Sequence, residues 1–573
     1  MRVRKKDRGL TVNAIAGTHV VFFGLDLTPA KRPGFRGFAF MRLDHANGEA
    51  VWLRGMKTFK STAPDPAPGT NFSTRDQPVQ SFQWADYAVR PGQAYTYTIV
   101  ALQGDPAKLV PRIQTTLDIT TEAEVGGTHS AFFNRGSVAT QEYARRFLNK
   151  PPSVAGPAAY SWLSRGLLEA LVEFIGRAGR GWAIHAAVYE FQWPAALTAL
   201  KEAAARGAQV RLLFDDIGQG AGKGPSKGNR AAIAKAGIGA LCQGRVNGQL
   251  MHNKFFVLSR VDARTGALAP DAVWTGSTNL TENGLFGHAN VGHIVADPLV
   301  ATQYLDTWTR LAADPKVDVA YRTINTTRSP SPPTPWKTLT STVFSPRGIK
   351  ASPFDALDWY ATIAGSATGA LMMTFAFGMD ERFKQVYRTD DGVLRMALLD
   401  KEGNGSTLAQ DRKDLSAIRA RANVVVAVGN NLVTNAFDRW LAEAARISNS
   451  THVPWIHTKF MLVDALGPTP LLISGSANFS KASCDTNDEN MLVVQGDRRV
   501  ADIYFGEYLR LYNHYAFREA VKRYVATHGA ADPDTWTPQY LVEDDRWMSD
   551  YFDPKDRSAR YLRRAYFSGP MAV

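Results

Sequence analysis

The chain has 573 residues, of which 45% are hydrophobic and 21% are charged. This composition excludes an intrinsically disordered protein and predicts two to four folded domains with a large core. The formal net charge of +13 favours an anionic partner such as nucleic acid, acidic lipid or a phosphorylated solute, although a basic, solvated surface accounts for it equally well.

The ends and the cysteines narrow the class of protein further. Met1–Lys6 is basic, but no long apolar run follows it and no stretch approaches the ~18 apolar residues of a membrane span. We therefore expect no cleaved signal and a cytoplasmic or membrane-peripheral location, with secretion by another route left open. Cys242 and Cys484 form no CxxC pair, which excludes an ordinary cysteine zinc site and a disulfide framework. We expect neither a metal ion nor another cofactor.

Residues 1–140 have the pattern of an all-β region. Apolar-rich runs separated by turn-rich segments occur at Val20–Leu27, Phe38–Leu43, Val51–Leu53, Val79–Trp84 and Tyr95–Leu102. The stretch Val89–Tyr97 resembles the tyrosine corner of fibronectin type III domains, where a tyrosine hydroxyl bonds to upstream backbone. We predict a β-sandwich, similar to fibronectin type III domains, over 1–140.

From residue 155 helices and strands alternate, and the series occurs twice. The first has expected elements at Tyr160–Phe174 (helix), Trp182–Phe191 (strand), Pro194–Arg206 (helix), Val210–Phe214 (strand) and Asn229–Ala236 (helix). The second has them at Pro353–Ala364 (helix), Leu371–Phe377 (strand), Glu381–Tyr387 (helix), Val393–Leu399 and Val424–Val428 (strands) and Leu432–Ile447 (helix). Leu212–Asp215 is echoed by Ala397–Asp400, which indicates a duplicated α/β unit.

The predicted architecture is therefore multidomain, a β-sandwich followed by two α/β lobes related by a pseudo-two-fold axis. The lobes span 155–327 and 341–530, the Pro-rich stretch 328–340 links them, and 531–573 is a C-terminal extension. Within this extension, Arg557–Phe567 mixes basic and aromatic residues. We expect a helix packed on the second lobe there, with contact to an acidic membrane or nucleic acid as the alternative.

Each lobe carries the same short signature. The first copy is His252, Lys254, Ser277 and Asn279, and the second copy is His457, Lys459, Asp464, Ser476 and Asn478. Histidine and lysine two apart on a strand point to one face, and the serine and asparagine side chains offer donors to phosphate oxygens. Two such sets facing each other can hold one phosphate, with one imidazole attacking phosphorus and the other protonating the leaving oxygen.

The paired signatures resemble those of the phospholipase D superfamily, His-x-Lys-x4-Asp followed by Gly-Ser/Gly-x-Asn, over about 155–530. The resemblance implies one active site between two similar lobes, a covalent phosphohistidine and independence from metal ions. By this resemblance His252, Lys254, His457 and Lys459 are catalytic, Ser277, Asn279, Ser476 and Asn478 bind the substrate phosphate, and Asp464 is a structural residue of the motif.

The two copies differ in ways that bear on the roles of the histidines. Ser259 stands at the Asp position of the first motif, and Asn290 stands where the second copy has Glu489. Because family members often place a carboxylate at Glu489 to orient the imidazole, local chemistry favours His457 as nucleophile, whereas family precedent favours the N-terminal histidine. We leave this assignment open. A substitute partner for His252 would have to come from Glu282 or His288.

Phosphodiester hydrolysis is the predicted reaction, and its substrate stays open. The first expectation is cleavage of a glycerophospholipid headgroup, with transfer to another alcohol as a variant, at a peripheral membrane surface. The alternatives are a nuclease that cuts DNA or RNA and an inactive phosphate-binding module. An acyl-accepting rim has aromatic material available in Trp84, Trp182, Trp193, Trp274, Trp336 and Trp455.

Overall fold

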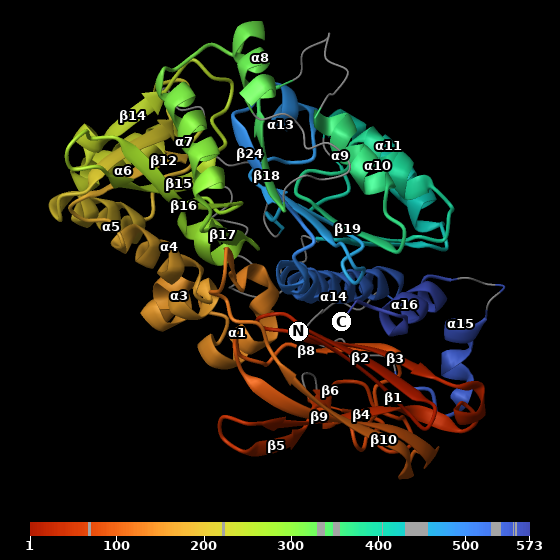
Figure 1. Cartoon of the computed structure of the whole chain (residues 1–573). Helices are drawn as coiled ribbons and strands as arrows, with labels where there is room; N and C mark the ends of the chain where they lie inside the picture. Colours follow the sequence, from red (N-terminus) through yellow and green to blue (C-terminus); the bar gives the residue numbers. More distant parts are fainter. Residues whose placement is uncertain are drawn as a thin grey trace.

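The protein consists of a β-sandwich beneath two α/β sheets. The computed structural model describes residues 1–66, 70–219, 224–328, 339–347, 356–403, 405–429, 456–528, 540–553, 555 and 558–572. The expected helix at 432–447 and most of the expected linker at 328–340 lie outside these ranges. Figure 1 shows the sandwich at the bottom, the first α/β sheet at the upper left and the second at the upper right.

The sandwich is two four-stranded antiparallel sheets packed face to face. Their strand orders are β1 (Arg2–Asp7), β2 (Leu10–Ala16), β3 (Val21–Leu27), β8 (Gln83–Asp86), and β10 (Lys108–Thr120), β9 (Ala94–Asp105), β4 (Phe35–Asp44), β5 (Glu49–Trp52). A short ribbon of β6 (Arg54–Gly55) and β7 (Phe72–Ser73) follows β5 in the chain. Along β10, Ile113, Leu117 and Ile119 are buried and the residues between them are mostly exposed, as one buried face requires. The all-β prediction is confirmed.

The tyrosine-corner bond is also present. The Tyr95 hydroxyl accepts a hydrogen bond from the backbone N–H of Arg90 at 2.9 Å, five residues upstream. The fibronectin type III resemblance itself stays a prediction.

The α/β part is a duplicated seven-stranded sheet, as predicted. The first sheet has the order β11 (His129–Phe133), β17 (Val291–Val295), β16 (Leu268–Gly276), β15 (Lys254–Val261), β12 (Trp182–Val188), β13 (Gln209–Asp215), β14 (Cys242–Arg245). The second has the order β18 (Thr340–Ser345), β24 (Glu489–Gln495), β23 (Leu471–Gly475), β22 (Phe460–Val463), β19 (Ala370–Phe375), β20 (Leu394–Leu399), β21 (Val424–Val428). The two orders correspond strand by strand, so each residue of one signature has an equivalent in the other lobe.

Two boundaries differ from the sequence prediction. The strand β11 lies within the range expected for the sandwich, yet it joins the first α/β sheet beside β17. The single helix expected at Tyr160–Phe174 is two helices, α3 (Pro157–Ser164) and α4 (Leu167–Gly176). Arg165 and Gly166 between them have φ of 49° and 89°, a left-handed conformation that ends a helix.

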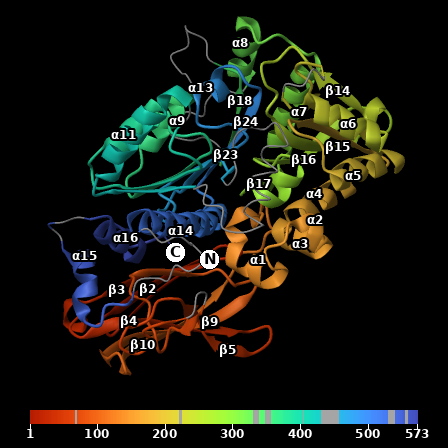
Figure 2. The ribbon, with the colours of Figure 1, turned by 180° about the vertical axis from the view of Figure 1, so that it is seen from behind.

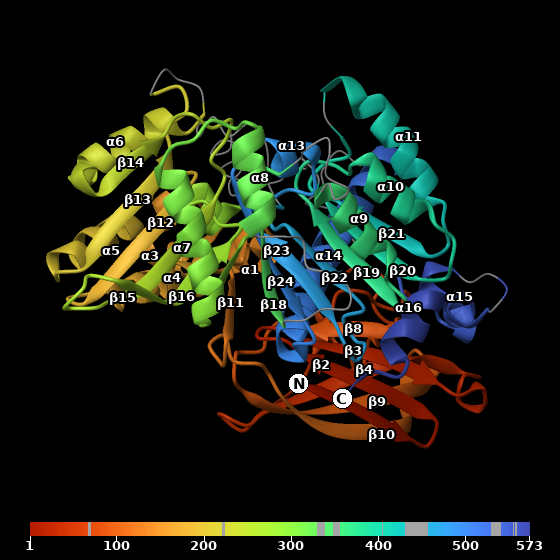
Figure 3. The ribbon, with the colours of Figure 1, turned by 45° about the horizontal axis from the view of Figure 1, so that its top comes forward.

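Helices cover both sheets. The remaining helices of the first lobe are α1 (Thr140–Phe147), α2 (Pro152–Ala155), α5 (Pro194–Ala205), α6 (Ser226–Ala236), α7 (Pro298–Ala312) and α8 (Val319–Arg328). Those of the second lobe, within the described residues, are α9 (Ala356–Gly365), α10 (Glu381–Arg388), α11 (Leu408–Arg419), α13 (Lys481–Asp485) and α14 (Arg498–His528). Seen from behind in Figure 2, α14 lies between the second sheet and the sandwich. Figure 3 shows the two sheets side by side, with β23 and β24 toward the centre.

The C-terminal residues return to the sandwich. Trp547, Met548 and Tyr551, in and beside α15 (Ser549–Phe552), join the apolar core between the two β-sheets. Helix α16 (Ala559–Ser568) packs on β3 as well as on β20 of the second lobe. The expected helix is therefore present, and it connects the sandwich to the second lobe. None of the helices in the described ranges has the length and apolarity needed to cross a membrane.

Candidate active site

The two signature histidines come together where the lobes meet. Their ring centroids lie 6.5 Å apart, and His252 and His457 are 6% and 4% exposed. Each histidine precedes its strand, β15 or β22, in an extended segment that pairs with the opposite lobe. Met251 forms a parallel bridge with Asp488, and Ile456 forms the equivalent bridge with Ala289. The convergence of the two signatures thus follows from main-chain pairing across the pseudo-two-fold axis.

Each imidazole is oriented by a residue of the other lobe. Nδ1 of His252 lies 2.8 Å from Oε2 of Glu489, and Nδ1 of His457 lies 2.9 Å from Oδ1 of Asn290. The amide orientation of Asn290 is fixed because its Nδ2 donates to the carbonyl of Gly284. Both Nδ1 atoms therefore carry a proton, and both Nε2 atoms are left for chemistry.

This arrangement overturns the sequence-based pairing of Glu489 with His457. The bridges place Asp488 beside His252, with a hydrogen bond from the His252 N–H to the Asp488 carbonyl at 2.9 Å, so the next residue, Glu489, reaches the first imidazole. The local argument for His457 as nucleophile is lost, because the carboxylate serves His252. The substitute partners are also wrong, since Glu282 accepts a hydrogen bond from Tyr160 and His288 packs against His457.

The motif serines contact the residues that orient the imidazoles. Ser476 Oγ donates to Glu489 at 2.7 Å, and Ser277 Oγ donates to Asn290 at 2.8 Å. Both hydroxyls, expected to bind phosphate, instead hold the groups that orient the histidines. The glycine before Ser476 is required by close packing, since a Cβ on Gly475 would lie 2.2 Å from the carbonyl oxygen of Asn490.

The motif asparagines differ between the lobes. Asn279 Nδ2 donates to Glu190 at 2.5 Å, which leaves its Oδ1 buried without a partner among the described residues. The equivalent Asn478 is half-buried, and its Oδ1 has no partner in the described part of the chain. Glu190 was missed by sequence reasoning, because nothing in its position marks a carboxylate that faces the site.

Two buried lysines, Lys254 and Lys459, lie close to each other in the site. Burial lowers the pKa of Lys254 to about 7, against the opposing effect of Glu489 and Glu190. Burial and the neighbouring Lys254 lower the pKa of Lys459 well below its usual value, and Lys459 Nζ has no hydrogen-bond partner among the described residues. Two desolvated ammonium groups side by side are stable only with an anion between them, which indicates an anionic ligand.

The histidines share this environment. Burial lowers the pKa of His252 to about 4, although Glu489 acts in the opposite direction. Burial and Lys459 lower the pKa of His457 well below its usual range. For Glu489 burial raises the pKa, but His252, Lys254 and the Ser476 hydrogen bond outweigh it and hold the pKa below its ordinary value. These shifts leave both imidazoles neutral and Glu489 ionised at neutral pH.

Asp464 lies away from the histidines, at the end of β22. Its carboxylate accepts hydrogen bonds from the backbone N–H groups of Thr368, Gly369 and Ala370 and from the Thr368 hydroxyl. It therefore anchors the turn before β19, and the structural role expected for the motif Asp agrees with these contacts.

Three of the six tryptophans proposed for an acyl-accepting rim, Trp84, Trp182 and Trp274, lie away from the histidines. Trp84 stacks on Phe40 in the sandwich, Trp274 is buried in the first sheet, and Trp182 lies under Arg260 at the far end of β12. Trp193 packs against buried Phe286. Trp336 and Trp455 lie outside the described residues.

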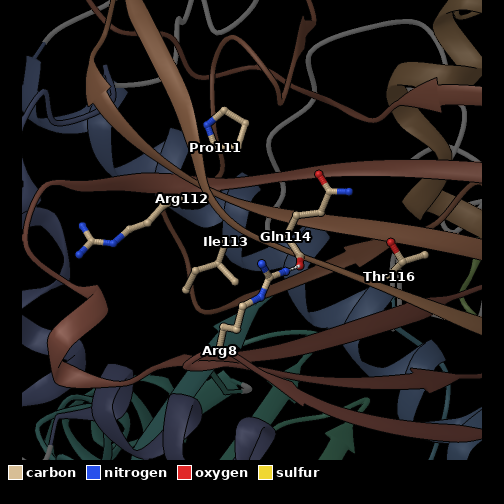
Figure 4. Close-up of a pocket in the computed structure, with 6 residues that line it drawn as sticks. All are labelled: Arg8, Pro111, Arg112, Ile113, Gln114 and Thr116. Atoms are coloured by element: carbon tan, nitrogen blue, oxygen red, sulfur yellow. Dashed lines mark hydrogen bonds between the residues drawn. The ribbon is translucent and has the colours of Figure 1, made fainter.

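A surface depression lies on the sandwich, remote from the histidines. Arg8 reaches across it to the Gln114 carbonyl, as Figure 4 shows. Its lining residues are Arg8, Pro111, Arg112, Ile113, Gln114 and Thr116. Across the described ranges, no group of three or more His, Cys, Asp or Glu side chains is placed to hold a metal ion.

Comparisons with known proteins agree with the duplicated fold. The family model described as "Cardiolipin synthase, PLD-like domain" matches residues 171–311 and 397–509, which contain both signatures. Comparison with curated proteins gives no match.

Three solved structures are similar at low identity. Phosphatidylserine synthase from Haemophilus influenzae is 11% identical over 63% of this chain and 92% of its own, with a TM-score of 0.42. Nuc, a phospholipase D family member from Salmonella typhimurium, is 23% identical over 26% of this chain and 86% of its own, with a TM-score of 0.21. Polyphosphate kinase from Porphyromonas gingivalis is 12% identical over 58% of this chain, with a TM-score of 0.36, and the chain spans 43% of its length. The family match, the two equivalent sheets and the paired signatures show that the chain contains a PLD-like domain built from these two regions.

Proposed function

We propose that this protein is a phosphodiesterase that forms a covalent phosphohistidine on His252. The observation that supports this proposal is the pair of imidazoles facing one space, with a carboxylate behind His252 and an amide behind His457. A carboxylate stabilises the positive charge that develops on an attacking imidazole, whereas an amide only fixes the tautomer. The nucleophile is thus His252, and the acid and base is His457.

In the first step, Nε2 of His252 attacks phosphorus and the bond from phosphorus to the leaving oxygen breaks. Protonated His457 gives its Nε2 proton to that oxygen, which departs as an alcohol. A bound phosphate next to His457 favours this proton, because an anion raises the His457 pKa that burial and Lys459 lower. Lys254 and Lys459 neutralise the non-bridging oxygens.

In the second step, water attacks phosphorus and the bond to His252 Nε2 breaks. Neutral His457 takes the proton of the water and regains its starting state. An alcohol in place of water gives transfer rather than hydrolysis. These steps need no metal ion, since the two buried lysines supply the charge that a metal would otherwise provide.

The substrate that we propose is a glycerophospholipid, whose headgroup is released. The matching family model is named for cardiolipin synthase, and this name supports a phospholipid substrate. The net charge of +13 suits an acidic bilayer surface. It suits a polynucleotide equally well, so cleavage of nucleic acid is the competing outcome of the test.

The decisive experiment gives the protein mixed-phospholipid vesicles in one tube and plasmid DNA in another, both with chelator. Release of headgroup from the vesicles, abolished by His457→Ala and unchanged by His185→Phe, supports the proposal. Cleavage of the plasmid alone replaces the lipid substrate with nucleic acid. Binding of phosphate without turnover of either substrate leaves only the binding-module alternative.

A further inference from the structure

The strongest unexplained feature of the site is a third histidine. His288 is 5% exposed, and its ring lies 5.5 Å from the ring of His457, tilted by 36°. Neither ring nitrogen has a hydrogen-bond partner among the described residues. Burying both nitrogens without partners is costly, so a side chain in this state indicates a ligand that satisfies them.

The main chain holds His288 rigidly in this position. Asn134, which is fully buried, donates from Nδ2 to the His288 carbonyl and accepts from the Asn290 N–H through Oδ1. The same loop begins with a π-helical turn, Asn283–Gly287, a conformation that is often found at functional sites. One loop thus carries both the residue that orients His457 and the imidazole beside it.

The residue equivalent to His288 in the other lobe is Asn487, and its side chain has a hydrogen-bond partner. Asn487, two residues before Glu489, donates from Nδ2 to Glu489 Oε1 at 3.4 Å. Beside His252, Asn487 thus supports the carboxylate of Glu489. Beside His457, the equivalent residue is His288, whose ring nitrogens bond to no described residue. The asymmetry follows the proposed division of roles, since the leaving group departs on the His457 side.

His288 is also suited to remain uncharged. Burial and then the nearby Lys459 lower its pKa to about 3, so at neutral pH the ring offers one donor and one acceptor. A neutral ring beside His457 can bond an alcohol oxygen without competing for the phosphate charge.

We propose that His288 binds the leaving-group oxygen of the substrate beside His457, and the attacking water in the second step. This inference rests on the proposed two-histidine reaction. It assigns to this protein a third imidazole that contacts the reacting atoms through a hydrogen bond, while proton transfer stays with His457.

The test compares two leaving groups. Phosphatidylglycerol loses an aliphatic alcohol that needs a proton and a hydrogen bond, whereas bis(p-nitrophenyl) phosphate loses a phenolate that needs neither. For His288→Phe we expect kcat/KM on phosphatidylglycerol vesicles to fall about tenfold to hundredfold. The burst of p-nitrophenol should change by no more than about twofold.

Two variants serve as controls. His288→Asn retains a donor and an acceptor and should recover phosphatidylglycerol turnover to within about threefold of the unmodified protein. His185→Phe replaces a buried histidine that packs on Trp308, outside the site, and should leave both substrates unaffected. Equal losses on both substrates for His288→Phe, or no loss on either, overturn the proposal.

A structure with orthovanadate bound provides an independent measurement. We expect a His288 ring nitrogen at about 3 Å from a vanadate oxygen on the His457 side. Vanadate on His252 with His288 facing away contradicts the inference. If the unmodified protein turns over neither substrate, the proposed function fails, and this vanadate complex alone decides the role of His288.

Discussion

At the scale of residues, the side chain that orients each imidazole decides what that imidazole can do. This side chain is Glu489 for His252 and Asn290 for His457. Glu489 is buried, ionised and shared between His252 and Ser476. Asn290 is equally buried but neutral, and it is fixed by Ser277. The two halves of the site are similar in shape and differ in charge, which separates the nucleophile from the acid and base.

The Glu489→Gln substitution tests this difference. The amide keeps the hydrogen bond to His252 but removes the charge, so we expect kcat on bis(p-nitrophenyl) phosphate to fall about 100-fold or more with a small change in KM. Asn290→Asp is the matched variant, since it adds a carboxylate behind His457, and it should cost less. A larger loss in Asn290→Asp than in Glu489→Gln would reverse the assigned roles.

Activity should also depend on pH through phosphate binding. Burial lowers the pKa of Lys254 to about 7 and raises that of Glu190 to about 7. As the pH rises through 7 in the free enzyme, Lys254 loses its positive charge and Glu190 becomes negative, and both changes repel a phosphodiester. We therefore expect kcat/KM to decrease above about pH 7, by up to tenfold per pH unit for each group.

Glu190→Gln separates the two contributions. The amide cannot ionise, so the decrease in kcat/KM above pH 7 should be shallower in this variant, and the difference is read from steady-state profiles between pH 6 and 9. An identical profile in Glu190→Gln assigns the pH dependence to Lys254 alone. A rise in kcat/KM above pH 7 contradicts the charges given to both groups.

The sequence identified the histidines and lysines of the site but not their partners. The motif spacing is local, so it was visible in the chain. The partner of His252 is set by a main-chain bridge between Met251 and Asp488, which are hundreds of residues apart. Pairing each histidine with the downstream residue of its own lobe was therefore bound to fail. The sequence offered His288 only as a substitute partner for His252, and the fold places it against His457 instead.

At the scale of elements, the central strands were the most predictable. The strand expected at Val424–Val428 matches β21, and the helix at Pro194–Arg206 matches α5 to within one residue. These segments are buried, so their apolar runs stand out. The strands β1 and β14 were missed because Arg2–Asp7 is highly charged and Cys242–Arg245 is short and polar.

The motif Asp, Asp464, stabilises the start of one strand, β19. Asp464 accepts hydrogen bonds from the backbone N–H groups of Thr368, Gly369 and Ala370, where β19 begins, and its removal leaves those groups without that partner. We expect Asp464→Ala to lower the free energy of unfolding by about 2 kcal/mol, measured by chemical denaturation, while kcat of the folded protein stays within about threefold.

Asp262→Ala is the matched control, since Asp262 is an exposed turn carboxylate near the same place in the first lobe, and it should change stability less. A loss of kcat in Asp464→Ala without a loss of stability would assign Asp464 to the chemistry instead.

At the scale of the whole molecule, buried ion pairs join parts that are distant in sequence. Arg165, between α3 and α4, pairs with Glu507 of α14 at 2.7 Å, and Arg2 of β1 pairs with Asp502 of α14 at 2.9 Å. Helix α14 thus connects the first lobe and the sandwich to the second lobe. No sequence pattern predicted these pairs, because each is formed only after the parts pack.

Glu507→Gln tests this connection. The substitution leaves Arg165 and Arg510 buried without their counter-ion, so we expect a loss of about 3–5 kcal/mol in the free energy of unfolding. Glu142→Gln, which removes an exposed ion pair with Arg145, should cost no more than about 1 kcal/mol. Similar, small losses in both variants would mean that α14 does not depend on this pair.

The most direct test of the shared site is to trap the intermediate. His457→Ala, mixed with bis(p-nitrophenyl) phosphate and quenched rapidly, should carry one p-nitrophenyl phosphoryl group on the peptide that contains His252, because attack needs no acid with this leaving group whereas hydrolysis needs His457. Peptide mass spectrometry locates the adduct, and His252→Ala should carry none. An adduct on His457 in the His252→Ala variant, or no adduct in either variant, would contradict the account.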